Sequence, residues 1–250
     1  MSDKNKTSKG RRRFLKAAAG GFAAATVAHG ANAAEADEKK NGAIQYGMLI
    51  DVRRCIGCHS CTVACKSEFD VPLGVERSWV EYVEKGEYPH AGRSFLPRLC
   101  NHCSEPKCAP VCPTDATYKR PEDGIVVVDS GVCIGCKYCI LACPYDARFF
   151  NPITHYADKC DFCVHRVSNG LVPSCVNTCI GGARVFGDLN DPNSEISALI
   201  ATNPVTILRA EAGTRPNVYY IGADHTDTYN TSPVRQYVRV ETHRRREGRR

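Results

Sequence analysis

Cysteine is the residue type that dominates the chemistry available to this chain. The 250 residues include sixteen cysteines, which fall into four groups of four with none left over. Close runs of four thiols hold cubane clusters of iron and sulfide, which carry single electrons, so sixteen thiolates predict four [4Fe–4S] clusters. The groups are Cys55, Cys58, Cys61 and Cys65; Cys100, Cys103, Cys108 and Cys112; Cys133, Cys136, Cys139 and Cys143; and Cys160, Cys163, Cys175 and Cys179.

Four other uses of these cysteines remain open. An even count allows disulfides in an oxidising compartment, although thiols in tight runs converge on a point rather than pairing. Paired C-x2-C motifs bind zinc, but a third cysteine two residues further on is uncommon in zinc sites. The sequence from Cys55 to His59 matches a c-type haem attachment, yet Lys137 stands at the position of His59 in the third group. One group could also be vestigial or hold a [3Fe–4S] cluster.

The fourth cysteine of each group is predicted to bind a cluster of another group. In two-cluster ferredoxins the fourth cysteine of one run ligates the other cluster. Pro113 and Pro144 follow the second and third groups, as in ferredoxins, so these two groups are expected to exchange their last ligands; the first and fourth groups are expected to do the same. The predicted ligand sets are set 1, Cys55, Cys58, Cys61 and Cys179; set 2, Cys65, Cys160, Cys163 and Cys175; set 3, Cys100, Cys103, Cys108 and Cys143; and set 4, Cys112, Cys133, Cys136 and Cys139.

Basic and histidine side chains accompany the cysteine runs. The basic residues either coat the surface or offset the charge of about −2 that each cluster carries with its thiolates. They are Arg53, Arg54, Lys66, Lys107, Lys137, Lys159, Arg166 and Arg184. The histidines are predicted to be structural or surface residues, because the cysteines complete each ligand set. They are His59, His102, His155 and His165.

The chain repeats itself, because residues 55–65 reappear at 133–143 with the same Ile-Gly and Ala positions. Each copy follows an apolar run that ends in Asp. We therefore predict an α+β fold of two duplicated ferredoxin-like halves, each holding two [4Fe–4S] clusters, with an inserted hairpin and a C-terminal wrapping segment. The predicted divisions are a core at 34–183 with an insertion at 66–99, a C-terminal partner-contacting segment at 184–242 and a basic tail at 243–250.

Short elements are expected after the last cysteine. Residues 184–186, 205–208 and 218–221 have the composition of strands. Asp191 is a candidate N-cap for a helix over residues 194–201, with Pro192 as its first residue.

The first 33 residues predict export. The run from Arg11 to Lys16 resembles the twin-arginine motif, with Gly10 in place of the usual Ser or Thr, and it precedes an apolar stretch and an Ala31-Asn32-Ala33 cleavage site. Whether the signal is cleaved is left open. Seven of the 33 basic and one of the 27 acidic residues lie in this segment, so 26 of each remain and nothing indicates nucleic-acid binding. The expected location is periplasmic, reached through the twin-arginine export machinery.

Several segments between residues 46 and 223 are similar to the iron–sulfur electron-transfer subunits of the dimethyl sulfoxide reductase family of molybdopterin oxidoreductases. The resemblance implies a molybdopterin catalytic subunit and a quinol-binding membrane anchor as partners, and a sulfur oxyanion such as tetrathionate as the substrate of the complex. Subunits of polysulfide, thiosulfate and sulfite-linked complexes share much of the same sequence. No substrate site is predicted in this chain, so it is expected to relay electrons rather than catalyse. The segments are 48–65, 96–103, 144–149, 157–160, 163–166, 181–184 and 187–188.

Overall fold

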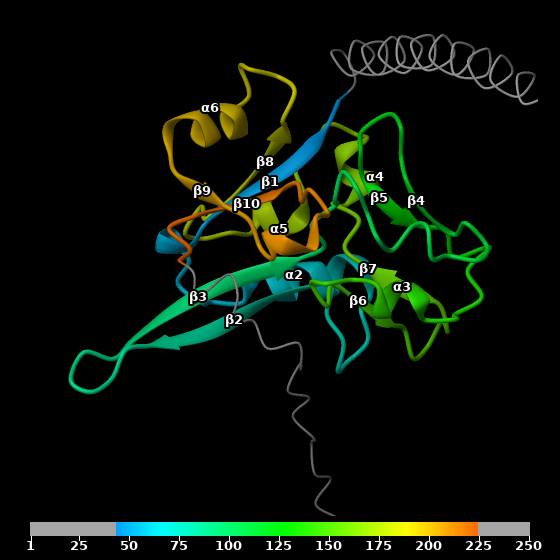
Figure 1. Cartoon of the computed structure of the whole chain (residues 1–250), viewed down its shortest axis with the longest axis horizontal. Coiled ribbons are helices and arrows are strands. Elements are labelled where there is room, and N and C mark those ends of the chain that lie inside the picture. Colours follow the sequence, from blue (N-terminus) through cyan, green and yellow to red (C-terminus); the bar gives the residue numbers. More distant parts are fainter. Residues whose placement is uncertain (1–43, 225–250) are drawn as a thin grey trace, which may run out of the picture. The chain divides into compact units, whose positions relative to one another are not determined.

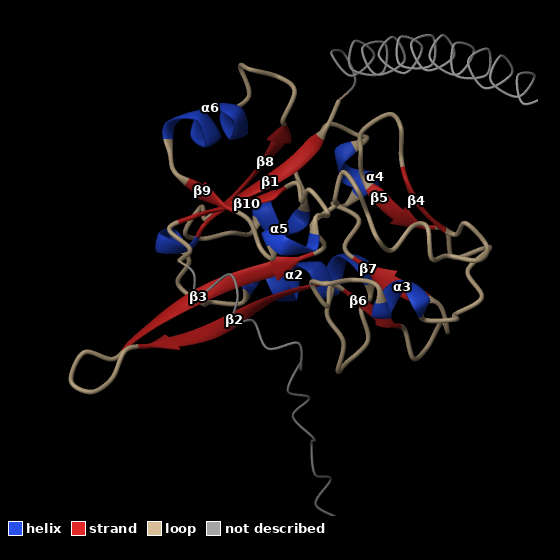
Figure 2. Cartoon of the chain, viewed as in Figure 1, coloured by secondary structure: helices blue, strands red, loops and turns tan. Residues whose placement is uncertain are grey.

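The computed structural model describes residues 44–224. They form small sheets and short helices joined by long loops (Figures 1 and 2). The predicted export segment 1–33 and basic tail 243–250 lie outside the described residues, as do residues 34–43 and 225–242. No helix within the described part has both the length and the apolarity needed to cross a bilayer.

A four-stranded sheet joins the two ends of the described chain. Its strands are β1 (Tyr46–Asp51), β8 (Arg184–Asp188), β9 (Val205–Thr206) and β10 (Val218–Ile221), in the order β8-β1-β10-β9. β1 runs antiparallel to β8 and parallel to β10. The segment predicted to wrap the core therefore supplies three of the four strands, and β1 lies between two of them.

The sheet is buried on both faces because its central strand is apolar from Met48 to Ile50. Met48 and Ile50 face the main core, where Val218 and Tyr220 of β10 join them. Leu49 faces the opposite side, where Ile196 of helix α6 (Glu195–Thr202) covers it. Parallel strands buried on both faces read as continuous apolar runs, which is what residues 48–50 show.

The N-cap predicted for helix α6 is wrong. Asp191 lies before the helix and accepts the backbone N–H of Asn193 at 2.9 Å. Ser194 is the N-cap, because its Oγ accepts the N–H of Ser197 at 3.2 Å. A serine hydroxyl at this position satisfies one of the amide donors left free in the first turn of a helix.

The inserted segment forms a long hairpin, as expected. Strands β2 (Ser78–Lys85) and β3 (Gly92–Leu99) pair along their whole length. Trp79, Val80 and Leu96 near the base are buried in the main core, whereas the tip extends away from it (Figure 1). The hairpin base thus forms one wall of the core that holds the cysteines.

The remaining elements are short and lie close to the cysteine runs. Helix α2 (Ser60–Phe69) packs against α5 (Ser174–Asn177). Two small hairpins pair β4 (Thr117–Lys119) with β5 (Val126–Val128), and β6 (Arg148–Phe150) with β7 (Ala157–Lys159). The other elements are α3 (Tyr138–Leu141), α4 (Val164–Val167) and the 3-10 turns η1 (Val52–Arg54) and η2 (Ala210–Ala212).

The sequence repeat gives two similar loops but helices of different length. α2 and α3 both begin after a residue in the left-handed conformation, His59 and Lys137 respectively. α2 continues through Cys65 for ten residues, while α3 has four. Pro144 accounts for the difference, because a proline disfavours helical backbone in the residue before it.

Candidate metal centres

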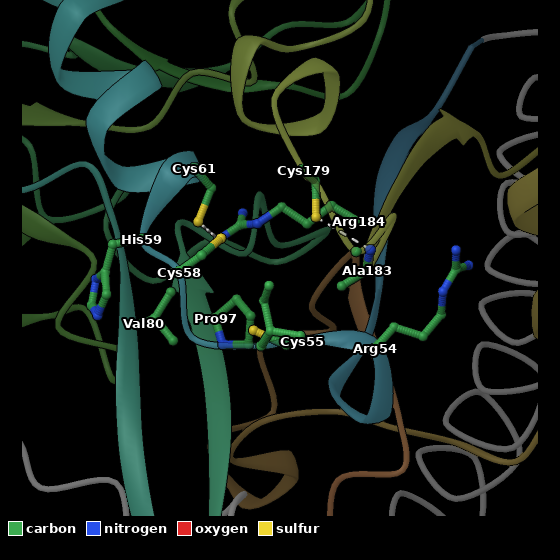
Figure 3. A pocket seen from close by; sticks show the side chains of 12 residues that line it. Arg54, Cys55, Cys58, His59, Cys61, Val80, Pro97, Cys179, Ala183 and Arg184 are labelled. Atoms are coloured by element: carbon green, nitrogen blue, oxygen red, sulfur yellow. Dashed lines mark hydrogen bonds between the residues drawn. The ribbon is translucent and has the colours of Figure 1, made fainter.

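One pocket is lined by three cysteines of the first group and the last cysteine of the fourth. Cys55 follows the η1 turn, Cys58 and Cys61 follow along the same run, and Cys179 follows α5. Figure 3 shows these sulfurs around one space, with Pro97 and Val80 of the hairpin beside them. The cavity encloses about 350 Å³, including its opening to solvent. These four residues are predicted set 1.

Backbone groups and burial shape the properties of these thiols. Burial raises the pKa of Cys55, and the backbone N–H of Gly57 opposes this effect. Cys179 Sγ accepts the N–H of Ala183 at 3.2 Å. Cys58 differs because it is exposed, and hydrogen bonds from Ser60 lower its pKa. N–H donors aimed at sulfur are one means by which proteins tune iron–sulfur clusters.

A second pocket brings together the four cysteines of predicted set 3. Cys100, Cys103 and Cys108 line it with Cys143 of the next group, and its volume is about 340 Å³ including the opening. Burial, with a smaller contribution from Cys100, raises the pKa of Cys103 to about 12 and that of Cys143 to about 11. Thiols in such surroundings need positive charge nearby in order to ionise, and bound iron supplies it.

The cysteines of predicted set 2 are all buried and affect one another electrostatically. Burial raises the pKa of Cys160, and Cys65 and Cys175 add to the increase. Burial also raises the pKa of Cys163 to about 12, again with a contribution from Cys175. Cys65 lies on α2 and Cys175 on α5, so the packing of these two helices brings distant parts of the chain together.

Predicted set 4 is only partly assembled by the contacts of the structure. Cys133 and Cys139 pack around one small apolar group with Val126. The sulfur of Cys112 lies in its own turn: burial would raise its pKa, but the N–H groups of Thr117, Thr114 and Ala116 lower it. Cys136 is exposed.

The pockets suit a four-iron cube, because each places its sulfurs around a cavity with largely apolar walls. All sixteen cysteines are free thiols rather than disulfides. Within residues 44–224, no three His, Cys, Asp or Glu side chains form a group that could hold a single metal ion. His59 also lines the first pocket, but its Nε2 atom lies 2.7 Å from the hydroxyl of Tyr82 and is engaged there. The four thiols that line each pocket are therefore its candidate donor set.

The basic residues near the cysteines differ in burial, and two of them, Lys66 and Arg166, are half-buried. Arg53, Arg54, Lys107 and Lys137 are exposed, whereas Lys159 and Arg184 are buried. Sequence reasoning missed Arg148, which is buried with its Nη2 atom 3.0 Å from Cys108 Sγ. Its only sequence signal was its position five residues after the last cysteine of a run.

His102 is a structural residue, as predicted, and it is fully buried. Its Nδ1 accepts the N–H of Val126 at 3.1 Å, and its ring stacks on Phe162 with centroids 3.7 Å apart. Burial lowers its pKa well below the ordinary value, and Lys159 and Arg148 contribute. His102 lies between Cys100 and Cys103, and Phe162 between Cys160 and Cys163, so the stack joins two cysteine loops.

Two family models match the chain, and both describe a 4Fe–4S dicluster domain. One covers residues 54–117 and the other residues 92–189. Two such domains and sixteen cysteines are consistent with four [4Fe–4S] clusters.

Curated relatives extend the match to most of the chain. A tetrathionate reductase subunit from Salmonella typhimurium is 52% identical over 184 residues, which cover 72% of this chain and 73% of that protein. A selenate reductase subunit from Mesobacillus selenatarsenatis is 44% identical, covering 71% and 72%. A Halobacterium salinarum protein assigned as an iron–sulfur subunit of dimethyl sulfoxide reductase is 42% identical, covering 72% and 79%. The chain therefore belongs to the family of iron–sulfur electron-transfer subunits of dimethyl sulfoxide reductase-type molybdopterin oxidoreductases.

Proposed function

We propose that this chain holds four [4Fe–4S] clusters in ligand sets 1 to 4 and relays electrons between two partner subunits. When bound, each cluster supplies a carrier for one electron. The observation that carries the proposal is the lining of the two pockets, where three cysteines of one group meet the last cysteine of another. Such linings support an exchange of fourth ligands like that of two-cluster ferredoxins.

The four sets are proposed to lie in the order 1, 2, 3, 4. Sets 1 and 2 share helix α2, which carries Cys61 and Cys65. Sets 2 and 3 adjoin where Cys100 raises the pKa of the buried Cys160, an effect smaller than that of burial itself. Sets 3 and 4 share the segment that contains Cys139 and Cys143.

Solvent exposure supports two electron exits at the ends of this order. Cys58 of set 1 and Cys136 of set 4 are exposed, while every cysteine of set 2 is buried. Exposed apolar residues accompany both ends, Ile56 beside Cys58 and Ile134 beside Cys136. Apolar surface next to an exposed ligand suits contact with a partner that excludes water. Cys160 and Cys175 of set 2 and Cys100 and Cys103 of set 3 are instead buried in the main core, together with residues of the hairpin base and the four-stranded sheet.

The proposed partners are a molybdopterin catalytic subunit and a quinol-binding membrane anchor. Tetrathionate is the first candidate substrate of the complex, in view of the Salmonella relative. Selenate, which the name of the Mesobacillus relative contains, is the second. Polysulfide, thiosulfate and sulfite-linked complexes are the remaining alternatives.

The ligand sets are tested by pairs of cysteine variants in the purified complex. We expect Cys65→Ser and Cys160→Ser to alter the same electron paramagnetic resonance signal, because both belong to set 2. Cys55→Ser and Cys179→Ser should both alter a different signal. This chain should account for sixteen of the irons in the unaltered complex. If Cys65→Ser altered the signal that Cys55→Ser alters, the exchange of fourth ligands would be wrong.

The location is a separate proposal, based on Arg11 and Arg12, and we propose the outer face of the cytoplasmic membrane. Arg11→Lys together with Arg12→Lys should retain the chain in the cytoplasmic fraction, since the export machinery reads the arginine pair. Arg13→Lys is the matched control and should leave export unchanged. Export of the double variant at the ordinary level would contradict the proposal.

A further inference from the structure

Three cations are buried in the described part of the fold without a carboxylate partner. The side chains are Arg148, Lys159 and Arg184, and each residue is 2 or 3% exposed. Among residues 44–224, none of the three has an aspartate or glutamate within ion-pair distance. By contrast, the buried Arg98 pairs with Glu81 at 2.5 Å, and the half-buried Arg77 pairs with Asp158 at 2.6 Å. A buried charge is costly unless something of opposite sign lies near it, so the surroundings of the three need an explanation.

Arg184 lies between sets 1 and 2. Its Nη2 atom is 3.5 Å from the sulfur of Cys61, and its Nη1 atom is 3.8 Å from the sulfur of Cys175. Figure 3 shows the side chain crossing from β8 toward Cys61. Nη2 also donates to Ser78 Oγ at 3.0 Å, which fixes the guanidinium in place. Burial opposes its charge, but Cys175 and Cys61 raise its pKa above the ordinary value.

Arg148 has the corresponding position between sets 3 and 4. Nη2 lies 3.0 Å from the sulfur of Cys108, and Nη1 donates to Thr117 Oγ1 at 3.2 Å. Burial opposes its charge as well, while Cys108, Cys100 and Cys139 raise its pKa. Cys108 and Cys100 belong to set 3 and Cys139 to set 4.

Lys159 lies where sets 2 and 3 adjoin. Its Nζ donates to the carbonyl oxygens of Val126 and Cys160. Cys160 belongs to set 2. On the other side, the charge of Lys159 reaches Cys108 of set 3, where it partly offsets the increase in pKa caused by burial.

We propose that Arg148, Lys159 and Arg184 are fixed counter-charges, one at each junction between successive clusters, that raise the reduction potentials of the two clusters they adjoin. The proposal rests on the ligand sets proposed above. Reduction adds one negative charge to a cluster, and a positive charge a few ångströms away in a medium of low dielectric constant stabilises that charge strongly. Exposed cations such as Arg54 and Lys107 are screened by water and have a much smaller effect. The three residues are positioning residues, because they act through the clusters rather than on a substrate.

The test is a redox titration of the purified complex, monitored by electron paramagnetic resonance, with iron counted in each variant. Arg184→Gln should decrease the equilibrium constant for reduction of two of the four clusters at least tenfold. For a one-electron couple, this corresponds to a reduction potential lower by about 59 mV. Those two should be the clusters whose signals Cys61→Ser and Cys175→Ser alter. Arg184→Lys keeps the charge and should restore at least half of the loss. Arg54 lines the same pocket but is exposed, so Arg54→Gln should change the equilibrium constant for reduction less than threefold.

Arg148→Gln gives an independent measurement at the other junction, with Lys107→Gln as its exposed control. It should lower the reduction potentials of the two clusters whose signals Cys108→Ser and Cys139→Ser alter. Full iron content with no shift at either junction would overturn the proposal and leave the ligand sets intact. Equal shifts of reduction potential in the Gln and Lys variants, or loss of iron from both, would show that these side chains serve packing. Either result would also overturn the proposal. A parent complex with fewer than four cluster signals would instead contradict the proposed function.

Discussion

Gly57 and Gly135 hold equivalent positions in the two repeated loops, and both adopt positive φ, 69° and 68°. Their surroundings differ. A Cβ at Gly57 would meet the ring of Phe95 at 2.5 Å, and a Cβ at Gly135 would meet the backbone carbonyl of His155 at 2.7 Å. A half-buried side chain can turn aside, whereas a backbone carbonyl cannot do so without moving the chain.

We therefore expect Gly135→Ala to reduce iron content more than Gly57→Ala does. Positive φ costs alanine about 1–2 kcal/mol at either position, so the difference comes from the contacts. Iron per chain and thermal loss of visible absorption measure it. Gly170→Ala is the control, because Gly170 has φ of 74° with nothing within 4 Å of the added atom. Equal iron loss in the two loop variants would contradict this interpretation.

Single residues show where sequence reasoning succeeds and where it stops. The cysteines could be identified from spacing alone, because their number and pattern are a local property of the chain. Arg148 and the stack of His102 on Phe162 could not be foreseen, because burial between two cysteine loops is created by segments far apart in the sequence. Arg184 was noticed as one of eight nearby cations, but its difference from Arg54 is one of burial, which the sequence does not contain.

At the scale of elements, the boundary of helix α6 makes a sharp test of capping. Ser194→Ala should destabilise the chain by about 1 kcal/mol, because the N–H of Ser197 loses its acceptor. For a chain of this size the apparent melting temperature should fall by about 2–4 °C. Asp191→Ala is the matched control and should lower it less. A larger decrease in melting temperature for Asp191→Ala would support Asp191 as the N-cap, as first predicted from the sequence.

Strand positions were more predictable than strand partners. The strand expected at 218–221 coincides with β10. Its parallel pairing with β1 could not be foreseen, because an apolar run indicates burial without indicating which strand lies beside it. The division placed at residue 183 followed the end of the cysteines, whereas the sheet continues across that point.

At the scale of the whole molecule, the sheet makes the described chain one unit. A chain ending at Gly182 lacks β8, β9 and β10 and leaves both edges of β1 unpaired, so we expect it to be insoluble or free of iron. A chain ending at Asp224 keeps all four strands and serves as the control. Iron content of the soluble fraction measures the difference. A soluble, iron-loaded chain ending at Gly182 would show that the cysteine core folds without the sheet.

Removal of the metal should have an equally global effect. Five cysteines lie in the main core, and the buried Arg148 and Arg184 side chains contact cysteine sulfurs. Without clusters, the cavities are left unfilled and the buried cations lose the negative charge beside them. We therefore expect the iron-free chain to lose its cooperative thermal transition. Circular dichroism before and after anaerobic chelation tests this. An unchanged cooperative transition would contradict it, and restored iron and sulfide should recover the original curve.

The meeting of Cys55 with Cys179 in one pocket has a consequence for biosynthesis. A ribosome makes the first thiols of that pocket roughly ten seconds before the last one, at ordinary rates of elongation. During this interval the early thiols are present without a complete site, and the parallel neighbour of β1 has not yet been synthesised. Insertion of the cluster of set 1 must therefore wait at least until Cys179 has been made, and the early thiols of this pocket need protection from oxygen and from foreign metals during that interval.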